Sequence, residues 1–310
     1  MGKTAFLFPG QGAQAVGMGE ALREAGSDTA AYFNQADETL GFALSDLMKD
    51  GPADQLTLTE NAQPALVTCS MAAYHLLTSQ TDLRPDYVAG HSLGEYAAIC
   101  AAGGFSFADA VQLVRLRGQA MQAAVPPGEG SMAAMLNMDP ADVEAVCKEA
   151  AEATGGVCVP ANFNTSAQIV ISGGAGPVDK AIELAKVRGA KRCMKLEVSA
   201  PFHSPMMQPA AEAMQKALAG CEMSDLTTPL VANVVAREVI AADEMRKLLV
   251  DQVTGAVRWE ASMRYLIDQG VETFVEIGAG RVLAGMMRRI DRKAKVFVVN
   301  GPADLEKLPN

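Results

Sequence analysis

The stretch Gly90-His91-Ser92-Leu93-Gly94 constrains the fold of this chain more than any other. It matches the pattern G-x-S-x-G, and it follows Val88-Ala89, which we interpret as the end of a β-strand. Residues 93–102 then read as a helix. The two glycines remove Cβ atoms that would clash in a sharp strand-to-helix turn. The pattern predicts a serine hydroxyl lifted clear of a sheet, beside free N–H groups at a helix N-terminus that can bind an oxyanion.

A serine on such a turn needs a base, and histidine is the usual one. The chain has three histidines, His75, His91 and His203. His91 is adjacent to Ser92, so its side chain points away, and His75 lies in the middle of a predicted helix. His203, in a proline-flanked loop, is therefore the base by elimination. No aspartate stands at an obvious position to orient its imidazole, so a glutamine side-chain oxygen or a backbone carbonyl is expected there, with Gln252 and its loop as candidates.

The order of predicted elements indicates an α/β protein with a parallel sheet. Short, almost wholly apolar runs that end at turns are typical of buried parallel strands. The strands predicted on this basis lie at residues 4–8, 86–89, 230–235, 271–277 and 295–299. The helices predicted between them cover residues 13–25, 29–40, 61–80, 93–102, 106–124, 206–219 and 281–290, with further helices around Glu244 and Trp259. Residues 51–59 are predicted as a loop.

The order of predicted elements is different in the middle of the chain. Strands are predicted at residues 131–138, 157–162, 168–172 and 191–198, with helices at 139–154 and 177–188. The resulting order βαββαβ is that of the ferredoxin-like fold. We therefore expect a large α/β subdomain made of residues 1–127 and 198–310, with a small ferredoxin-like subdomain, residues 128–197, inserted between its halves.

Composition limits the classes of function. The net charge of −10 argues against nucleic-acid binding, and no apolar run approaches the length of a membrane span. The six cysteines form no C-x-x-C pair, and with only three histidines no zinc spacing is present. No secretory signal is visible. We expect a cytoplasmic protein with free thiols and no metal ion.

Parts of the sequence are compatible with two other functions. Residues 10–15 match G-x-G-x-x-A, which opens a nucleotide-binding alternative. However, Pro9 stiffens the turn, and the sequence about 20 residues further on looks helical where a second strand and a ribose-binding acid belong. We favour a glycine-rich turn that brings backbone N–H groups to a pocket. A serine esterase is the other alternative, and it predicts turnover of acyl esters without a thiol acceptor.

Four motifs in order resemble the malonyl-CoA:acyl carrier protein transacylase family. They are F-P-G-Q-G at residues 8–12, G-H-S-L-G-E-Y at 90–96, R-L-R-G-x-x-M at 115–121 and F-H-S at 202–204. The resemblance covers essentially the whole chain and implies a hydrolase-like core with the ferredoxin-like insert. It also implies ping-pong transfer of a malonyl group from malonyl-CoA through Ser92 to acyl carrier protein, with no cofactor. A free-standing acyltransferase of polyketide synthesis shares every catalytic residue and stays an alternative.

The same resemblance implies roles for further residues. The backbone N–H groups of Gln11 and Leu93 match the oxyanion hole, and Arg117 matches the arginine that pairs with the free malonyl carboxylate. Gln252 matches the position beside the catalytic histidine. The pocket positions that match are Gln63, Met121, Asn162 and Phe202. In similar enzymes a phenylalanine directly before the histidine accompanies malonyl rather than branched units, because bulk there crowds an α-methyl group, a preference of about 1–3 kcal/mol.

Positive charge is clustered in two places despite the acidic total. The first cluster is Lys186, Arg188, Lys191, Arg192 and Lys195, and the second is Arg281, Arg288, Arg289, Arg292, Lys293 and Lys295. Because the carrier protein that the resemblance implies is acidic, we expect both clusters to border its docking surface. We expect a monomer, with neither nucleic acid nor membrane as a partner.

Overall fold

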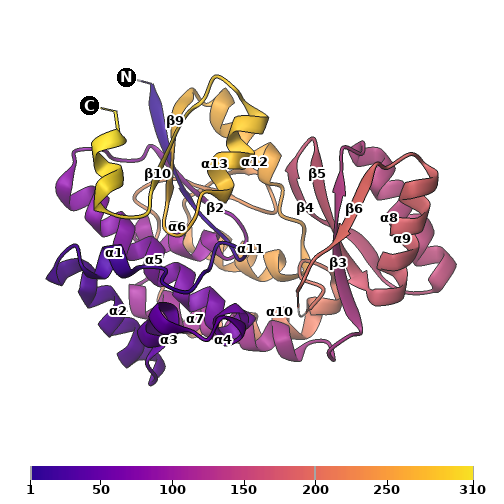
Figure 1. Cartoon of the computed structure of the whole chain (residues 1–310), viewed down its shortest axis with the longest axis horizontal. Coiled ribbons are helices and arrows are strands. Elements are labelled where there is room, and N and C mark those ends of the chain that lie inside the picture. Colours follow the sequence, from indigo (N-terminus) through magenta and orange to yellow (C-terminus); the bar gives the residue numbers. More distant parts are fainter. Residues whose placement is uncertain (1, 199, 310) are drawn as a thin grey trace.

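The structure is a computed structural model that describes residues 2–198 and 200–309, and it contains two β-sheets (Figure 1). The larger sheet has the strand order β10-β9-β1-β2-β7-β8. Its strands are β1 (Lys3–Phe8), β2 (Tyr87–Gly90), β7 (Leu230–Ala232), β8 (Arg237–Val239), β9 (Val271–Ile277) and β10 (Lys295–Val299). Neighbouring strands from β10 to β7 run parallel, and β8 pairs antiparallel with β7 at one edge. The predicted α/β fold with a parallel sheet is confirmed.

Helices cover both faces of the larger sheet. Phe6 and Phe8 of β1 contact Tyr74 on one face, whereas Ala5 and Leu7 belong to a second core on the other face. Burial on both faces explains why β1 is a continuous apolar run. The helices of this unit are α1 (Glu20–Arg23), α2 (Ser27–Leu40), α3 (Leu44–Asp50), α4 (Ala53–Thr57), α5 (Thr59–Gln80), α6 (Gly94–Ala101), α7 (Phe107–Ala123), α10 (Gln208–Ala219), α11 (Ala242–Thr254), α12 (Trp259–Asp268) and α13 (Val282–Ile290), with 3-10 turns η1 (Pro205–Met207) and η2 (Pro302–Lys307).

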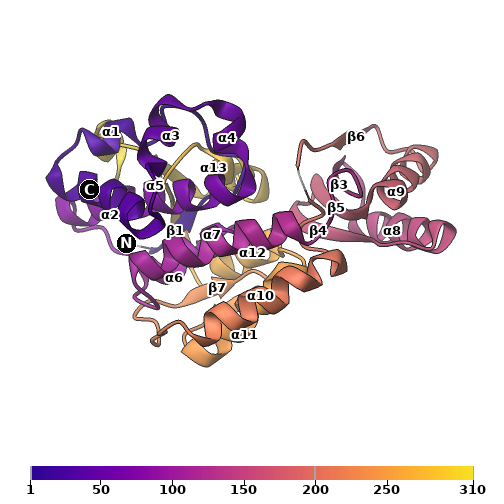
Figure 2. The same ribbon diagram turned by 90° about the horizontal axis from the view of Figure 1, so that it is seen from below.

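The smaller sheet is antiparallel, with the order β4-β5-β3-β6, and it stands apart at one end of the molecule (Figure 2). Its elements are β3 (Gly130–Leu136), α8 (Pro140–Thr154), β4 (Cys158–Thr165), β5 (Gln168–Gly174), α9 (Ala175–Val187) and β6 (Arg192–Lys195). This is the predicted βαββαβ order. Ala133 and Met135 pack against α8 and α9, while Met132 faces the larger unit. The division of the chain at residues 127 and 197 stays a prediction, and all six elements lie between these positions.

Predictions for the N-terminal region were partly wrong. The helix predicted over residues 13–25 is limited to α1, because Gly17 and Gly19 adopt positive φ angles of 87° and 84° that interrupt a helix. A Cβ at Gly19 would lie 2.7 Å from the ring of Phe33, so glycine is required there. Residues 51–59, predicted as a loop, contain α4, and α3 was also missed. Outside this region the predictions missed β8.

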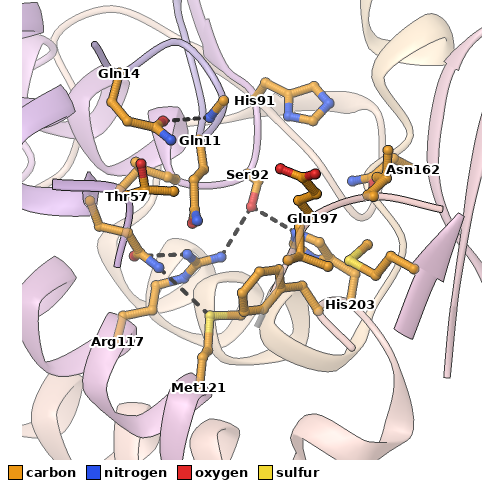
Figure 3. A pocket seen from close by; sticks show the side chains of 17 residues that line it. Gln11, Gln14, Thr57, His91, Ser92, Arg117, Met121, Asn162, Glu197 and His203 are labelled. Carbon is orange, nitrogen blue, oxygen red and sulfur yellow. Dashed lines mark hydrogen bonds between the residues drawn. The ribbon is translucent and has the colours of Figure 1, made fainter. Parts of the chain in front are cut away.

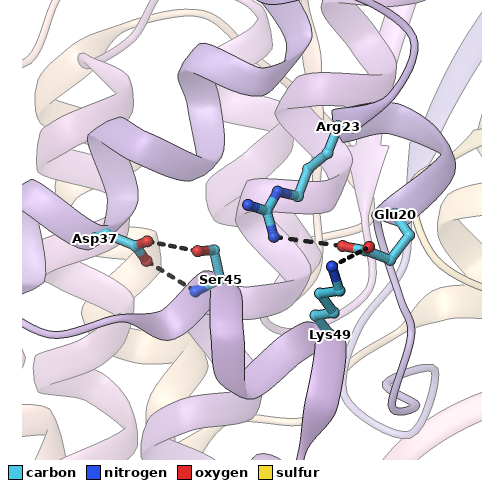
Figure 4. A network of polar contacts seen from close by, with 5 residues as sticks. All are labelled: Glu20, Arg23, Asp37, Ser45 and Lys49. Atoms are coloured by element: carbon cyan, nitrogen blue, oxygen red, sulfur yellow. Dashed lines mark hydrogen bonds and ion pairs between the residues drawn. The ribbon is translucent and has the colours of Figure 1, made fainter.

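Polar contacts between helices hold this region together (Figure 4). Asp37 on α2 accepts hydrogen bonds from the backbone N–H (2.8 Å) and the hydroxyl (2.5 Å) of Ser45, in the first turn of α3. Glu20 on α1 pairs with Arg23 at 3.4 Å and with Lys49 on α3 at 3.5 Å. The N-terminus of α3 is thus satisfied by a residue from another helix, so its own sequence carries no capping signal.

Candidate active site

Ser92 lies on a sharp turn between β2 and α6. Its φ of 51° is in the left-handed region. A Cβ at Gly90 would lie 1.9 Å from the backbone of Gly94, and a Cβ at Gly94 would lie 2.1 Å from the carbonyl oxygen of Phe8. Both glycines are therefore required by close backbone packing, as the motif predicts. The turn presents the Ser92 hydroxyl to a cavity of about 330 Å³ (Figure 3).

The side chain of Asn233, directly after β7, holds this turn. Its Oδ1 accepts a hydrogen bond from the Ser92 N–H at 2.7 Å, and its Nδ2 donates to the Gly90 carbonyl at 2.7 Å. The backbone N–H of Asn233 donates to Glu95, in the first turn of α6, at 3.1 Å. Asn233 is fully buried, so water does not compete for these bonds.

His203 reaches Ser92 from the loop that follows β6. Its Nε2 lies 2.7 Å from Ser92 Oγ, as the elimination among three histidines predicts. Its Nδ1 lies 2.9 Å from the backbone oxygen of Gln252 and 3.1 Å from that of Gly255. Because a carbonyl can only accept, Nδ1 carries the proton, and Nε2 is free to accept the serine proton.

Backbone carbonyls therefore orient the His203 imidazole, in the third position of the site after the serine and the histidine. The sequence left open whether the side chain or the main chain of Gln252 does this, and in the structure it is the main chain. Gln252 lies on α11 and not in a loop. Burial, followed by the positive charge of Arg117, lowers the pKa of His203 to about 3. The imidazole is neutral at pH 7 and able to act as a base.

Arg117, on α7, approaches Ser92 from the side opposite His203 (Figure 3). Its Nη2 donates to Ser92 Oγ at 3.2 Å and to Gln252 Oε1 at 2.9 Å. Its Nη1 donates to Gln63 Oε1 at 2.9 Å. The residue is 2% exposed, and burial lowers its pKa. Within the described chain these hydrogen-bond partners are all neutral groups, so the guanidinium is a buried cation open to an anionic ligand.

The side chain of Gln252 connects this cation to a buried carboxylate. Its Oε1 accepts from Arg117, while its Nε2 donates to the Ser92 carbonyl at 2.9 Å and to Glu95. Glu95 is 2% exposed, and burial raises its pKa to about 7. One residue thus orients the base through its main chain and the arginine through its side chain.

Two backbone N–H groups at the cavity wall are available to an oxyanion. The N–H of Ser92 is occupied by Asn233, so it is excluded. The N–H groups of Leu93 and Gln11 donate to no atom in residues 2–198 and 200–309, and both residues line the cavity. The side chain of Gln11 donates to Thr59 Oγ1 at 3.2 Å, which steadies the glycine-rich turn. This turn belongs to the serine pocket, as the interpretation favoured over nucleotide binding requires.

Nine of the ten predicted site residues line the cavity, and Gln252 lies behind Arg117 and His203. The Gln63 amide donates to Met121 Sδ at 3.9 Å. The further lining residues are Gly12, Gln14, Thr57, His91, Met132, Leu196, Glu197 and Val198. The cavity therefore has α5, α7 and the serine turn on one side and β3, β4 and the segment after β6 on the other.

Sequence reasoning missed Asn233, Glu95 and Glu197. Glu95 is the one charged residue in the otherwise apolar stretch 93–102, which was a usable signal for a buried functional carboxylate. Asn233 directly follows an apolar strand, where the carboxyl edge of a parallel sheet collects functional groups. Glu197 carried no signal, and its carboxylate projects into the cavity (Figure 3).

The other two histidines have structural surroundings. His91 Nε2 lies 2.8 Å from Asn164 Oδ1, and its ring lies 5.3 Å from that of Trp259. The ring of His75 lies 5.6 Å from that of Tyr32. All six cysteines are unpaired. Within the described residues no group of His, Cys, Asp or Glu is arranged to hold a metal ion, and no helix is long and apolar enough to cross a membrane.

The sequence matches the family described as "Acyl transferase domain" over residues 5–299. The chain belongs to this acyl transferase family. A malonyl CoA-acyl carrier protein transacylase of Bacillus subtilis is 47% identical over 306 residues, which cover 99% of this chain and 96% of that protein. The transacylase of the same name from Escherichia coli K12 is 42% identical over 303 residues, with coverages of 98% and 97%. The family resemblance that the four motifs predict is confirmed.

Solved structures of similar enzymes have the same fold. An acyl-carrier-protein-S-malonyltransferase from Bartonella henselae superposes with a TM-score of 0.95 at 47% identity, covering 98% of both chains. A malonyl-transacylase solved in complex with its type II PKS acyl-carrier protein has a TM-score of 0.95 at 38% identity, also covering 98% of both chains. The hydrolase-like core with a second, antiparallel sheet is thus an architecture that this chain shares with its family.

Proposed function

We propose that this chain transfers the malonyl group from malonyl-CoA to the phosphopantetheine thiol of acyl carrier protein, for fatty acid synthesis. The observation that carries the proposal is the environment of the Ser92 hydroxyl, with His203 Nε2 at 2.7 Å and Arg117 Nη2 at 3.2 Å. A base beside a serine suits acyl transfer, and a buried guanidinium beside the same hydroxyl suits an acyl group that ends in a carboxylate. The names of the similar proteins agree with this function.

In the first half-reaction, Ser92 Oγ attacks the thioester carbon of malonyl-CoA, and the serine proton passes to His203 Nε2. The N–H groups of Leu93 and Gln11 stabilise the negative oxygen of the tetrahedral intermediate. The carbon–sulfur bond then breaks, and His203 returns the proton to the sulfur of coenzyme A. A malonyl ester remains on Ser92.

In the second half-reaction, the carrier-protein thiol gives its proton to His203, and the sulfur attacks the ester carbon. The same two N–H groups stabilise the oxyanion. The carbon–oxygen bond breaks, and Ser92 Oγ takes the proton back from His203. All proton transfers use one base, so we propose that the reaction requires no cofactor and that the coenzyme A thioester enters only as a substrate.

Arg117 selects the acyl group. Its planar guanidinium can bind the free malonyl carboxylate through two hydrogen bonds inside a largely apolar pocket. A serine esterase would leave this buried cation without a role, which argues against that alternative. Phe202 lines the cavity directly before His203, where its ring narrows the space for an α-methyl group. Asn162 on β4 is 7% exposed and lines the same cavity.

Mass spectrometry of the intact protein tests the proposal directly. Incubation with malonyl-CoA is expected to add one malonyl group to the wild-type chain and none to Ser92→Ala. Holo carrier protein should then remove the group, whereas its apo form, which lacks the thiol, should not. A malonyl-protein that is cleared by water as fast as by holo carrier protein would identify a hydrolase instead.

A carrier protein of polyketide synthesis is a second candidate acceptor. One observation favours it, because a similar malonyl-transacylase was solved with a type II PKS acyl-carrier protein. The chemistry would be unchanged. The ratio of kcat/KM for the two classes of holo carrier protein decides between them, and a higher value for the polyketide carrier would replace the first candidate.

We also propose that the two basic clusters border the docking surface of the carrier protein. Some of these cations are already neutralised, because Arg188 pairs with Glu149 at 2.7 Å and Lys195 pairs with Asp179 at 2.6 Å. The cations without an ion pair among the described residues are Lys186, Lys191 and Arg192 in the first cluster and Arg281, Arg288, Arg289, Arg292 and Lys293 in the second. These are available to an acidic partner.

The oligomeric state and the cellular compartment of the chain are also part of the proposal. We propose a cytoplasmic monomer, which is supported by six unpaired cysteines of the kind that persist in reducing compartments. Light scattering coupled to size-exclusion chromatography should give a mass near 32.5 kDa. A mass of twice that value would contradict the monomer.

A further inference from the structure

A buried carboxylate stands behind the substrate pocket, and the reaction as proposed does not use it. Glu95 Oε1 accepts a hydrogen bond from the Asn233 N–H at 3.1 Å, and its Oε2 accepts one from Gln252 Nε2. The same Gln252 carboxamide accepts from Arg117 Nη2 at 2.9 Å through its oxygen. Glu95 and Arg117 are each 2% exposed, so one amide group links a buried anion to a buried cation.

The buried cluster of Glu95, Arg117 and His203 is electrically neutral in the free enzyme when Glu95 is ionised. Ionised Glu95 and Arg117 together carry no net charge, and His203 is neutral. A malonyl group on Ser92 brings its own carboxylate to Arg117, so two anions would then share one cation away from water. An uncompensated buried charge is costly, and a buried carboxylate relieves that cost by taking up a proton.

We propose that ionised Glu95 takes up a proton when the pocket receives the malonyl carboxylate, so that the buried cluster stays neutral. The proton comes from solvent and binds a carboxylate oxygen of Glu95, and no other bond forms or breaks. The inference rests on the proposed function, because it requires an anionic acyl group at Arg117. An uncharged acyl group such as acetyl brings no second anion and causes no uptake.

The surroundings of Glu95 place this event near neutral pH. Burial raises the pKa of Glu95 to about 7, and Arg117 is the charged group that lowers it. Once the malonyl carboxylate pairs with Arg117, that lowering effect is offset and the pKa of Glu95 rises. A carboxyl that is half ionised at pH 7 then becomes protonated.

The other groups around Glu95 do not titrate in this range. The facing side chain of Gln252 and the backbone N–H of Asn233 are neutral at every pH of interest. Burial raises the pKa of Tyr96, on the same helix, to about 12. The pKa of His203 is about 3, so protonation of His203 would appear only in acid.

Proton uptake can be measured with an indicator dye in weakly buffered solution. Stoichiometric malonyl-CoA or acetyl-CoA is added to the enzyme, and mass spectrometry of the same samples counts the acyl groups. Conversion of a thioester and a serine into an ester and a thiol has no net proton change, and the ionisation of free coenzyme A is common to both donors. We expect about half a proton per malonyl group at pH 7, more at pH 8, none below about pH 5, and none for acetyl at any pH.

Two matched variants show whether Glu95 is the residue that takes up the proton. Glu95→Gln keeps the size of the side chain but cannot titrate, and it should abolish the uptake. Glu276→Gln is the control, because Glu276 is also buried and accepts hydrogen bonds from the backbone N–H groups of Leu283 (3.1 Å) and Ala284 (2.7 Å), outside the pocket. It should retain the uptake of the wild type.

Equal uptake for malonyl and acetyl groups in the wild type would overturn the inference, and this comparison needs no variant to fold. Uptake that persists in Glu95→Gln, or that peaks near pH 4 in the wild type, would overturn it as well by placing the proton on another group. A wild-type sample without a malonyl adduct would instead count against the proposed function, so the two failures are distinguishable.

Discussion

The buried state of His203 predicts that Ser92 stays reactive in acid. Burial and the charge of Arg117 lower the pKa of this imidazole to about 3. At pH 5 a histidine with an ordinary pKa of about 6.5 would be about 3% neutral, whereas one with a pKa of about 3 is about 99% neutral. The difference is about thirtyfold in the amount of competent base.

An uncharged sulfonyl fluoride is a suitable probe, because it reacts with an activated serine and needs no carboxylate anchor. The rate constant for modification of Ser92, followed by intact mass, should agree within about twofold between pH 5 and pH 8. A fall of about thirtyfold over this range, with a midpoint near 6.5, would refute the reasoning.

The contribution of Arg117 can be separated from that of burial. In Arg117→Met the positive charge is lost, so the acid midpoint of the modification rate should rise, while burial still holds it below the ordinary value. Arg115→Met is the control on the same helix, because Arg115 pairs with Glu60 at 3.4 Å instead of facing the pocket. Identical pH profiles for the two variants would show that the charge of Arg117 does not act on His203.

Three further changes test the site and its surroundings. Arg117→Ala should lower kcat/KM for malonyl-CoA by about thirtyfold or more while acetyl-CoA changes little, since truncating one partner of a buried charge pair costs about 2–5 kcal/mol; a retained malonyl preference would contradict the carboxylate anchor. Asn233→Ala leaves the Ser92 N–H and the Gly90 carbonyl unpaired, so urea unfolding should show a loss of about 2–5 kcal/mol together with a lower kcat; a loss well below 1 kcal/mol would mean that the turn does not depend on this side chain. Replacing Lys191 and Arg192 together by alanine should raise the KM for holo carrier protein and weaken its dependence on salt, and unchanged values for both would exclude this cluster from docking.

The proposed nucleophile Ser92 and its proposed base His203 could be predicted from sequence, because Ser92 lies in a local motif and His203 is selected from a small set of histidines. Gly90 and Gly94 flank the serine within five residues; Gly90 packs against Gly94 inside the turn itself, and Gly94 packs against Phe8 at the end of β1. His203 was found because only three histidines exist and the other two were unsuitable. Strands such as β9 and β10 were placed correctly for a related reason, since burial on both faces leaves a continuous apolar run.

The partner of His203 could not be found in the same way. Its Nδ1 donates to the backbone oxygens of Gln252 and Gly255, which lie 49 and 52 residues away in the sequence. Every residue has a backbone carbonyl, so no residue type marks this role. Asn233 is a similar case, because it contacts Ser92 across 141 positions through an amide that belongs to no motif.

The helix predicted over residues 13–25 failed for a different reason. Its apolar spacing is compatible with a helix, but Gly17 and Gly19 take left-handed conformations. The chain before α1 instead wraps around the end of β1, where Gln11 and Gly12 line the cavity. The backbone conformations of Gly17 and Gly19 overrode the local periodicity.

Backbone carbonyls are suitable groups to orient the His203 imidazole, because the proposed substrate is an anion. A carboxylate bonded to Nδ1 would raise the pKa of His203 and would add a negative charge to a cluster that must accept the malonyl carboxylate. The two carbonyls, at 2.9 and 3.1 Å, fix the same tautomer without a charge. Arg117 then keeps enough positive charge to lower the pKa of the base and to attract the acyl carboxylate. A serine esterase with a neutral substrate has no such constraint, so the uncharged third position and the buried arginine are two parts of one arrangement for an acidic acyl group.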